Sequence, residues 1–106
     1  MIFEIALLTA RPGLQDQVRD GLRAARPVIA RMPGYVDSVF HQGLEEPESF
    51  VLRIAWQTRE AYTESFRQVE LLTEWRSHFI HLLAGAPKVM PYETIAGPES
   101  SSVTFR

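Results

Sequence analysis

The sequence contains no cysteine, little excess charge of either sign and no long hydrophobic run. The absence of cysteine excludes disulfides, thiolate metal sites, iron–sulfur clusters and cysteine nucleophiles. The net charge of −2 provides no basic field, so we expect neither nucleic acid nor a membrane surface as a partner. The apolar run near the start, Ile5 to Leu8, is far shorter than the roughly 20 residues that span a bilayer. We therefore predict a cytoplasmic protein.

The chain does have the length and composition of one folded domain. Its 106 residues are 45% hydrophobic and 23% charged, which is typical of soluble globular chains and is too short for two domains. We assign residues 1–96 to this domain. Residues 97–106 are rich in serine and threonine, and we expect them to form a flexible or partner-contacting tail.

The spacing of apolar residues predicts alternating strands and helices. A period of two and a richness in β-forming residues indicate strands over 2–10, 35–42, 50–57 and 88–95. A period near 3.6 indicates helices over 14–32 and 59–84, the second in two pieces that bend near residues 68–70. Gly21, inside the first helix, is expected to cost it about 1 kcal/mol relative to alanine. The order βαββαβ predicts an α+β, ferredoxin-like fold, with a four-stranded antiparallel sheet and both helices on one face.

The first strand is apolar on both of its faces. Ile5 and Leu7 point to one side of the sheet, and Ala6 and Leu8 point to the other. The helices cover only one side, so a second copy of the chain is the simplest partner for the other. The sequence therefore predicts a homodimer.

Short motifs in a fixed order along residues 1–95 resemble one known family. They are Pro33-Gly34-Tyr35, Pro47 to Leu52, Trp56 to Tyr62, Phe66-Arg67, Trp75-Arg76 and Tyr92-Glu93. Together they resemble the antibiotic biosynthesis monooxygenase domain, a dimeric α/β-barrel family. The resemblance implies a homodimer whose two sheets pack face to face. It also implies a pocket in each protomer between the sheet and the helices.

The resemblance implies several possible activities. The family includes oxygenases that oxidise polycyclic aromatic phenols without metal or flavin, haem-degrading enzymes and quinol oxygenases, and the fold alone does not choose among them. We expect a small cofactor-independent monooxygenase that acts on an aromatic phenol or quinol. The main alternative is a non-catalytic or stress-related dimer that binds a small hydrophobic molecule. A haem-degrading monooxygenase and a muconolactone-type isomerase are more distant alternatives.

Individual positions in the resemblance bear on these alternatives. Trp56 matches a tryptophan that lies in the pocket of both the haem-degrading and the cofactor-free branches. The haem-degrading branch has a histidine on the second long helix and an asparagine on the first strand, where this chain has Arg76 and Ala6. Tyr62 stands where many relatives carry a histidine. The differences at Arg76 and Ala6 argue against haem.

Arg76 is the polar residue whose position is most informative. It lies about 40° around the helix from Leu72, inside the apolar sector, and is therefore expected to point into the pocket. A buried arginine needs an anionic or acceptor partner. Arg76 either holds a phenolate or peroxy anion during oxygenation, or forms a structural ion pair with a carboxylate such as Glu93.

The three histidines are candidate general bases, because the imidazole pKa lies near neutrality. His41 falls near the end of the second strand and His78 at the edge of the apolar sector of the long helix, whereas His81 falls on its outer side. A catalytic role for His41 or His78 competes with a packing or surface role. Their spacing matches no metal motif, so we predict no metal site.

Aromatic side chains at helical and strand positions form either a wall for a flat substrate or part of the core. The candidates for substrate binding are Trp56, Tyr62, Phe66 and Trp75, with Phe79 assigned more readily to the core. No nucleophile elbow or glycine-rich phosphate loop is present in the sequence. We therefore expect no NAD or ATP site and no cofactor.

Overall fold

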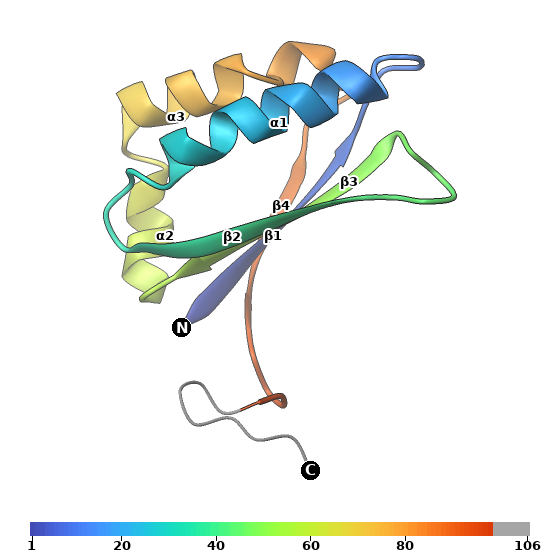
Figure 1. Ribbon diagram of the computed structural model, residues 1–106. Helices are drawn as coiled ribbons and strands as arrows, with labels where there is room; N and C mark the ends of the chain where they lie inside the picture. Colours follow the sequence, from blue (N-terminus) through green and yellow to red (C-terminus); the bar gives the residue numbers. More distant parts are fainter. Residues whose placement is uncertain (99–106) are drawn as a thin grey trace.

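The computed structural model describes residues 1–98, so most of the predicted tail lies outside the described residues. One antiparallel sheet is covered on one face by helices (Figure 1). The strands are β1 (Ile2–Thr9), β2 (Tyr35–Gln42), β3 (Ser49–Trp56) and β4 (Lys88–Glu93). The helices are α1 (Gln15–Ile29), α2 (Arg59–Ser65), α3 (Val69–Ser77) and the short 3₁₀ turn η1 (Ile80–Leu82).

The sheet has the strand order β2-β3-β1-β4, with β3 and β1 as its inner strands. All three pairings are antiparallel. The predicted ferredoxin-like fold is therefore confirmed, including the hairpin of β2 and β3. Strand β4 lies at an edge of the sheet. Pro91 is tolerated there, because an edge strand can lack one N–H donor without breaking a ladder inside the sheet. No helix within residues 1–98 is long and apolar enough to cross a membrane.

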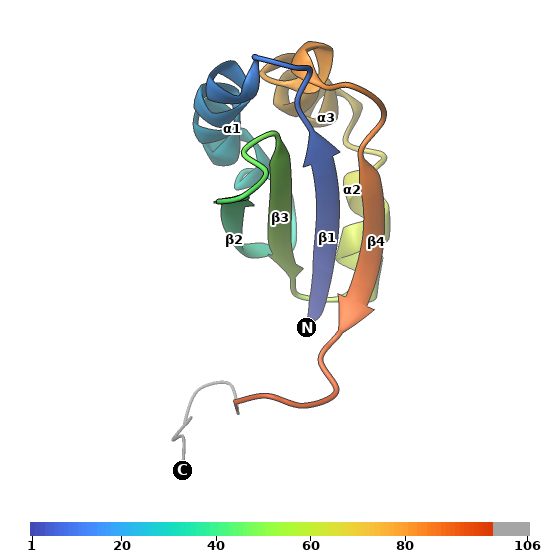
Figure 2. The ribbon, with the colours of Figure 1, turned by 90° about the vertical axis from the view of Figure 1, so that its right-hand side faces the viewer.

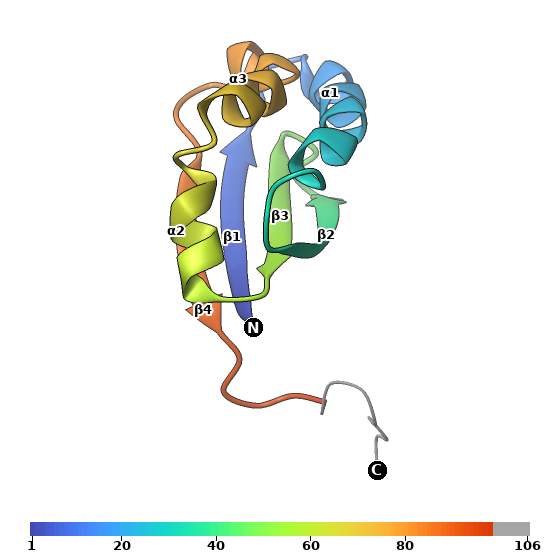
Figure 3. The same cartoon turned by 90° about the vertical axis from the view of Figure 1, so that its left-hand side faces the viewer.

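Figure 3 views the molecule from the helix side, with the helices in front of the sheet. The core lies between these two layers. On β1, Ala6 and Leu8 are buried and Leu7 is exposed, because alternate side chains point to opposite faces. Helix α1 places its apolar stripe on the same core, with Val18 and Ala25 fully buried. The predicted faces of strand and helix are thus both observed.

The second helical region differs from its prediction. It forms two pieces as expected, with the break at residues 66–68 rather than 68–70, but α3 ends at Ser77 rather than continuing to residue 84. The backbone that follows bonds to the end of β1 instead: Ala84 N–H donates to the carbonyl of Thr9 and Arg11 N–H to that of Leu82. These bonds between distant segments replace helical ones, and local periodicity carries no sign of them.

The other face of the sheet is covered by no helix within the described residues (Figure 2). The pairing register places Leu7 beside Val51 on this face, together with Met90 and Tyr92 of β4. All four side chains are exposed in the single chain. This face, called the open sheet face below, is apolar as the sequence predicted.

Candidate functional site

A cavity of about 510 Å³ lies between the sheet and the segment that runs from the end of α2 to β4. Its volume falls within the range of small-molecule sites, about 300–1,000 Å³. The sheet provides aliphatic side chains such as Leu52, Ile54 and Val89, and α3 provides Leu72 and Trp75. The cavity is therefore suited to a flat, largely apolar molecule.

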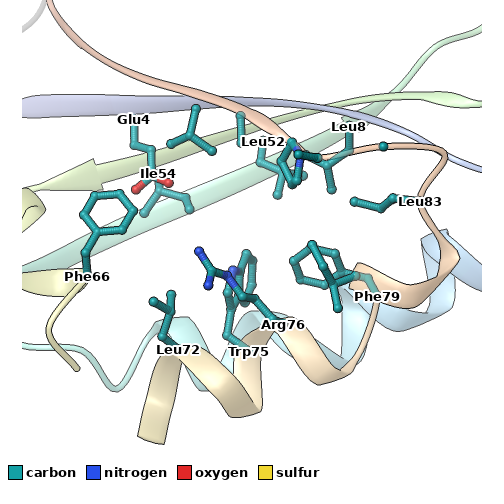
Figure 4. A pocket seen from close by; sticks show the side chains of 16 residues that line it. Glu4, Leu8, Leu52, Ile54, Phe66, Leu72, Trp75, Arg76, Phe79 and Leu83 are labelled. Carbon is teal, nitrogen blue, oxygen red and sulfur yellow. The ribbon is translucent and has the colours of Figure 1, made fainter. Parts of the chain in front are cut away.

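Two charged residues line this cavity, Glu4 from β1 and Arg76 from α3. Figure 4 shows the Glu4 carboxylate and the Arg76 guanidinium pointing from opposite walls into the space between sheet and helix. Within residues 1–98, no ion pair or hydrogen bond joins them. The two opposite charges therefore both face the cavity, and the space between them is not closed by an ion pair.

Glu4 is the site residue that sequence reasoning missed. Residues two apart on a strand share a face, so Glu4 points to the same side as Ala6 and Leu8, toward the core. That alternation was available in the sequence, and a charged residue on an otherwise apolar face was the signal. Its position opposite Ile54 in the β1–β3 ladder brings it into the cavity.

The buried Trp56 anchors Glu4. Its indole Nε1–H donates a hydrogen bond of 3.0 Å to Glu4 Oε1. Burial raises the pKa of the Glu4 carboxyl, and this hydrogen bond partly opposes the rise. Among the described residues nothing donates to Oε2, which leaves one carboxylate oxygen for a ligand.

Arg76 points into the cavity, as its helical phase predicted, but it is exposed rather than buried. The expectation of a buried arginine was wrong, because the residue lies where the cavity opens to solvent. Within the described part of the chain, the predicted alternative of an ion pair with Glu93 is also not formed. The guanidinium is therefore available to an anionic group in the cavity.

The predicted aromatic residues divide into two groups. Phe66 and Trp75 line the cavity, and Trp75 packs edge-on against Phe79 at a centroid distance of 5.0 Å. Trp56 is fully buried and is not part of the cavity lining, and its indole is linked to the site by the hydrogen bond to Glu4. Tyr62, half-buried on α2, lies outside the lining. Burial raises its pKa, and the Glu4 carboxylate adds to this rise, so its hydroxyl stays protonated.

The predicted histidines lie away from the cavity lining. His41 pairs with Val51 on β2 and β3 and is exposed on the open sheet face. His78 forms the C-terminal cap of α3, with its backbone carbonyl against Gly21 of α1. Among residues 1–98 no three histidine, aspartate or glutamate side chains come together as a metal site would require.

The fold and cavity define a class: a ferredoxin-like domain with a cavity between its sheet and helices. The family model described as antibiotic biosynthesis monooxygenase matches residues 1–77. The chain therefore belongs to the antibiotic biosynthesis monooxygenase family. Members of this family are typically dimeric.

Individual relatives agree with this assignment. The uncharacterised protein YczJ of Bacillus subtilis (strain 168) is 30% identical over 95 residues, which cover 90% of this chain and 100% of YczJ. A candidate antibiotic biosynthesis monooxygenase from Bordetella bronchiseptica has a crystal structure that matches with a TM-score of 0.82 and 28% identity, covering 90% of this chain and 97% of that one. SnoaB, a cofactor-independent oxygenase from Streptomyces nogalater, shares the fold at 14% identity, with a TM-score of 0.77 over 91% of this chain and 94% of SnoaB.

Proposed function

We propose that this protein is a cofactor-independent monooxygenase that oxidises an aromatic phenol or quinol in the cavity beside α3. The observation that carries the proposal is an apolar cavity of about 510 Å³ whose two charged lining residues, Glu4 and Arg76, face it from opposite walls. Apolar walls suit the aromatic rings of the substrate, and the charges suit its hydroxyl groups. Membership of a monooxygenase family supports the same conclusion.

The proposed reaction balances without an added reductant. Loss of the phenolic proton places negative charge on the ring carbons ortho and para to the oxygen, and the carbon that reacts is one of these that carries a hydrogen. That carbon reduces O₂ and forms a C–O bond, giving a peroxide. Loss of the hydrogen on the same carbon and cleavage of the O–O bond then leave a quinone carbonyl, while the second oxygen atom departs as water. The substrate is oxidised to the quinone and supplies all the electrons that reduce O₂.

Arg76 is proposed to stabilise the anions formed along this path. Its guanidinium is a permanent cation with several donors in a planar fork, and it points into an apolar cavity where such donors act strongly on a developing negative charge. Phe66 and Trp75 are proposed to hold the rings of the substrate. No role in the chemistry is proposed for His41 or His78, because both lie outside the lining.

The functional unit is proposed to be a homodimer formed through the open sheet face. A single chain exposes Leu7, Val51, Met90 and Tyr92 there, each more than a third accessible. Covering such a face removes apolar surface from water, which stabilises the dimer by about 25 cal/mol for each Å² buried. A second copy would supply a matching surface through two-fold symmetry.

Oxygen uptake with a panel of naphthols, anthrone-type phenols and hydroquinones tests the function. The protein is first dialysed against a chelator, and rates are corrected for autoxidation without protein. We expect saturable oxygen consumption by at least one class of substrate. Ligand binding without oxygen uptake across the whole panel would contradict the proposal and favour a ligand-binding dimer.

A further inference from the structure

We infer that Glu4 is the proton acceptor of this site, taking the phenolic proton through its free carboxylate oxygen while Arg76 holds the resulting anion. This inference rests on the proposed function and assigns its first step. A base must lie within hydrogen-bond reach of the substrate hydroxyl. Glu4 is the carboxylate in the cavity lining, and the lining contains no histidine.

The bond to Trp56 gives Glu4 the geometry that this role requires. The indole Nε1–H holds Oε1 at 3.0 Å, and Trp56 itself is fully buried, so one end of the carboxylate is fixed by the core. Oε2 receives no hydrogen bond from the described residues. The carboxylate is thus oriented with its unpaired oxygen available to the cavity, as preorganised bases are.

The groups around Glu4 leave this oxygen unpaired. Tyr62 approaches from α2 and Arg76 from α3, while Glu93 lies on the same sheet face at the β4 edge. Within residues 1–98 none of the three forms a hydrogen bond or ion pair with Glu4. A ligand between β1 and α3 therefore meets an acceptor on one wall and a cation on the other.

The environment of Glu4 also suits proton transfer. Burial raises its pKa, which brings a carboxylate closer to the operating pH of a general base. In the proposed cycle the O–H bond of the phenol breaks and Glu4 Oε2 gains the proton. The same proton returns to the peroxide before the O–O bond breaks, so Glu4 ends the cycle ionised.

A purely structural role is the competing explanation. A buried indole N–H needs an acceptor, and Glu4 supplies one whether or not it meets a substrate. Glu4→Gln separates the two roles, because the glutamine carbonyl still accepts from Trp56 but is not a base. Glu93→Gln is the matched control: it removes a neighbouring carboxylate on β4 that does not line the cavity.

The experiment compares kcat/KM for wild type, Glu4→Gln and Glu93→Gln as a function of pH. The substrates are 1-naphthols whose ring substituents at position 2 lower the pKa of the hydroxyl. We expect Glu4→Gln to lose about 10²- to 10⁴-fold at pH values below the substrate pKa. Its deficit should shrink as the naphthol becomes more acidic, because a phenol that ionises by itself needs no base. Wild type should show an acidic limb that Glu4→Gln lacks, and Glu93→Gln should match wild type.

The outcomes separate this inference from the proposed function. If wild type consumes oxygen and Glu4→Gln does so equally well with the same pH profile, Glu4 is only the acceptor for Trp56 and the inference is overturned. An equal loss with every naphthol, whatever its pKa, also overturns it. If wild type consumes no oxygen with any substrate of the panel, the proposed function fails and the inference fails with it.

Trp56→Phe provides a second readout. This change keeps an aromatic ring and removes the N–H that lowers the pKa of Glu4. We expect the acidic limb of kcat/KM to move to higher pH, measured well below the melting temperature of the variant. A limb that does not move would contradict a role for Glu4 in that limb.

Discussion

At the scale of single residues, the site consists of two opposite charges that share a cavity without pairing. Arg76 can remain a free cation because it is exposed where the cavity opens. Glu4 is more buried than Arg76, and one hydrogen bond from Trp56 partly offsets the free-energy cost of burying its carboxylate. A substrate with an acidic hydroxyl complements both groups, and each can be tested separately.

Arg76→Met should separate catalysis from stability. The side chain is exposed and has no ion-pair partner within residues 1–98, so the free energy of unfolding should change by less than about 0.5 kcal/mol. We expect kcat to fall by about 10²-fold or more, since one preorganised donor to the anion is lost. Arg76→Lys should restore part of the rate, because an ammonium lacks the planar fork of donors.

Thermal melting and oxygen uptake measured on the same Arg76→Met sample decide this prediction. A large fall in melting temperature with a proportionate loss of activity would show that Arg76 supports the fold rather than the reaction. The interpretation of Arg76 as half of a structural ion pair predicts that result, with a loss of about 3–5 kcal/mol.

Glu4→Gln should change how stability depends on pH. The pKa of Glu4 is raised in the folded protein above its ordinary value of 4.5. Its contribution to stability is therefore fully present below that value and is lost as the pH rises through the raised pKa. Glutamine does not titrate, so the melting temperature of the variant should gain on that of wild type between pH 4.5 and neutrality. A difference that stays constant over this range would contradict the raised pKa.

The sequence predicted part of this site. The helical phase of Arg76 placed it in the cavity, since a phase depends only on local spacing. Glu4 was not predicted, although strand alternation places this charged residue on the apolar, core-facing side of β1. Histidines were favoured as bases for their ordinary pKa, whereas burial changes the pKa of a carboxylate only once the fold exists. Whether a pKa is perturbed depends on tertiary surroundings that no local pattern records.

At the scale of elements, α1 and the end of α3 meet at a glycine. A Cβ added to Gly21 would lie 2.2 Å from the backbone carbonyl oxygen of His78. The sequence suggested that Gly21 only weakens its helix, because helix propensity takes no account of a neighbouring element. The structure shows that the position needs a residue without a side chain, which allows the two helices to approach.

Gly21→Ala should therefore destabilise the protein despite its better helix propensity. We expect the free energy of unfolding to fall by about 1–3 kcal/mol, because overpacking against backbone outweighs the roughly 1 kcal/mol that alanine gains in a free helix. Gly85→Ala is the control, since a Cβ there meets nothing within 4 Å. Denaturant unfolding of both variants tests the pair, and a Gly21→Ala protein as stable as wild type would contradict the close approach.

Element positions were predicted well where the period was local and poorly where distant segments decide. The strands β1, β2 and β3 begin and end within one residue of their predicted limits. Residues 78–84 were expected to continue a helix, but the structure has only the 3₁₀ turn η1 there. The backbones of Leu82 and Ala84 bond to the chain at the end of β1, beside an isolated bridge between Ala10 and Leu83. Those bonds form because the fold brings the end of β1 beside this segment, which local periodicity does not record.

At the scale of the whole molecule, the open sheet face decides how the chain assembles. The helices occupy one face of the sheet (Figure 2). The other face exposes apolar side chains along β1, β3 and β4. This face was predicted from the two apolar sides of β1 alone, since the layer order follows from the order of strands and helices. The proposed dimer would bury it.

Leu7→Arg should prevent that assembly. Leu7 lies on the inner strand β1 of the open sheet face, where a partner would bury the unpaired charge of the new arginine. Val69→Arg is the control, because Val69 is 68% exposed at the start of α3 in the helical layer. Light scattering at micromolar concentration should give the mass of two chains for wild type and Val69→Arg, and of one chain for Leu7→Arg. A wild-type mass of one chain would contradict the dimer.

The most direct test of the proposed function is the fate of oxygen itself. Wild-type protein, freed of metal by a chelator, is given its best substrate from the panel under oxygen-18 gas, and the products are analysed by mass spectrometry after short reaction times. We expect one labelled atom in the new quinone carbonyl and the other in water. A quinone that carries oxygen from water only, or a substrate recovered unchanged, would contradict monooxygenation in this cavity.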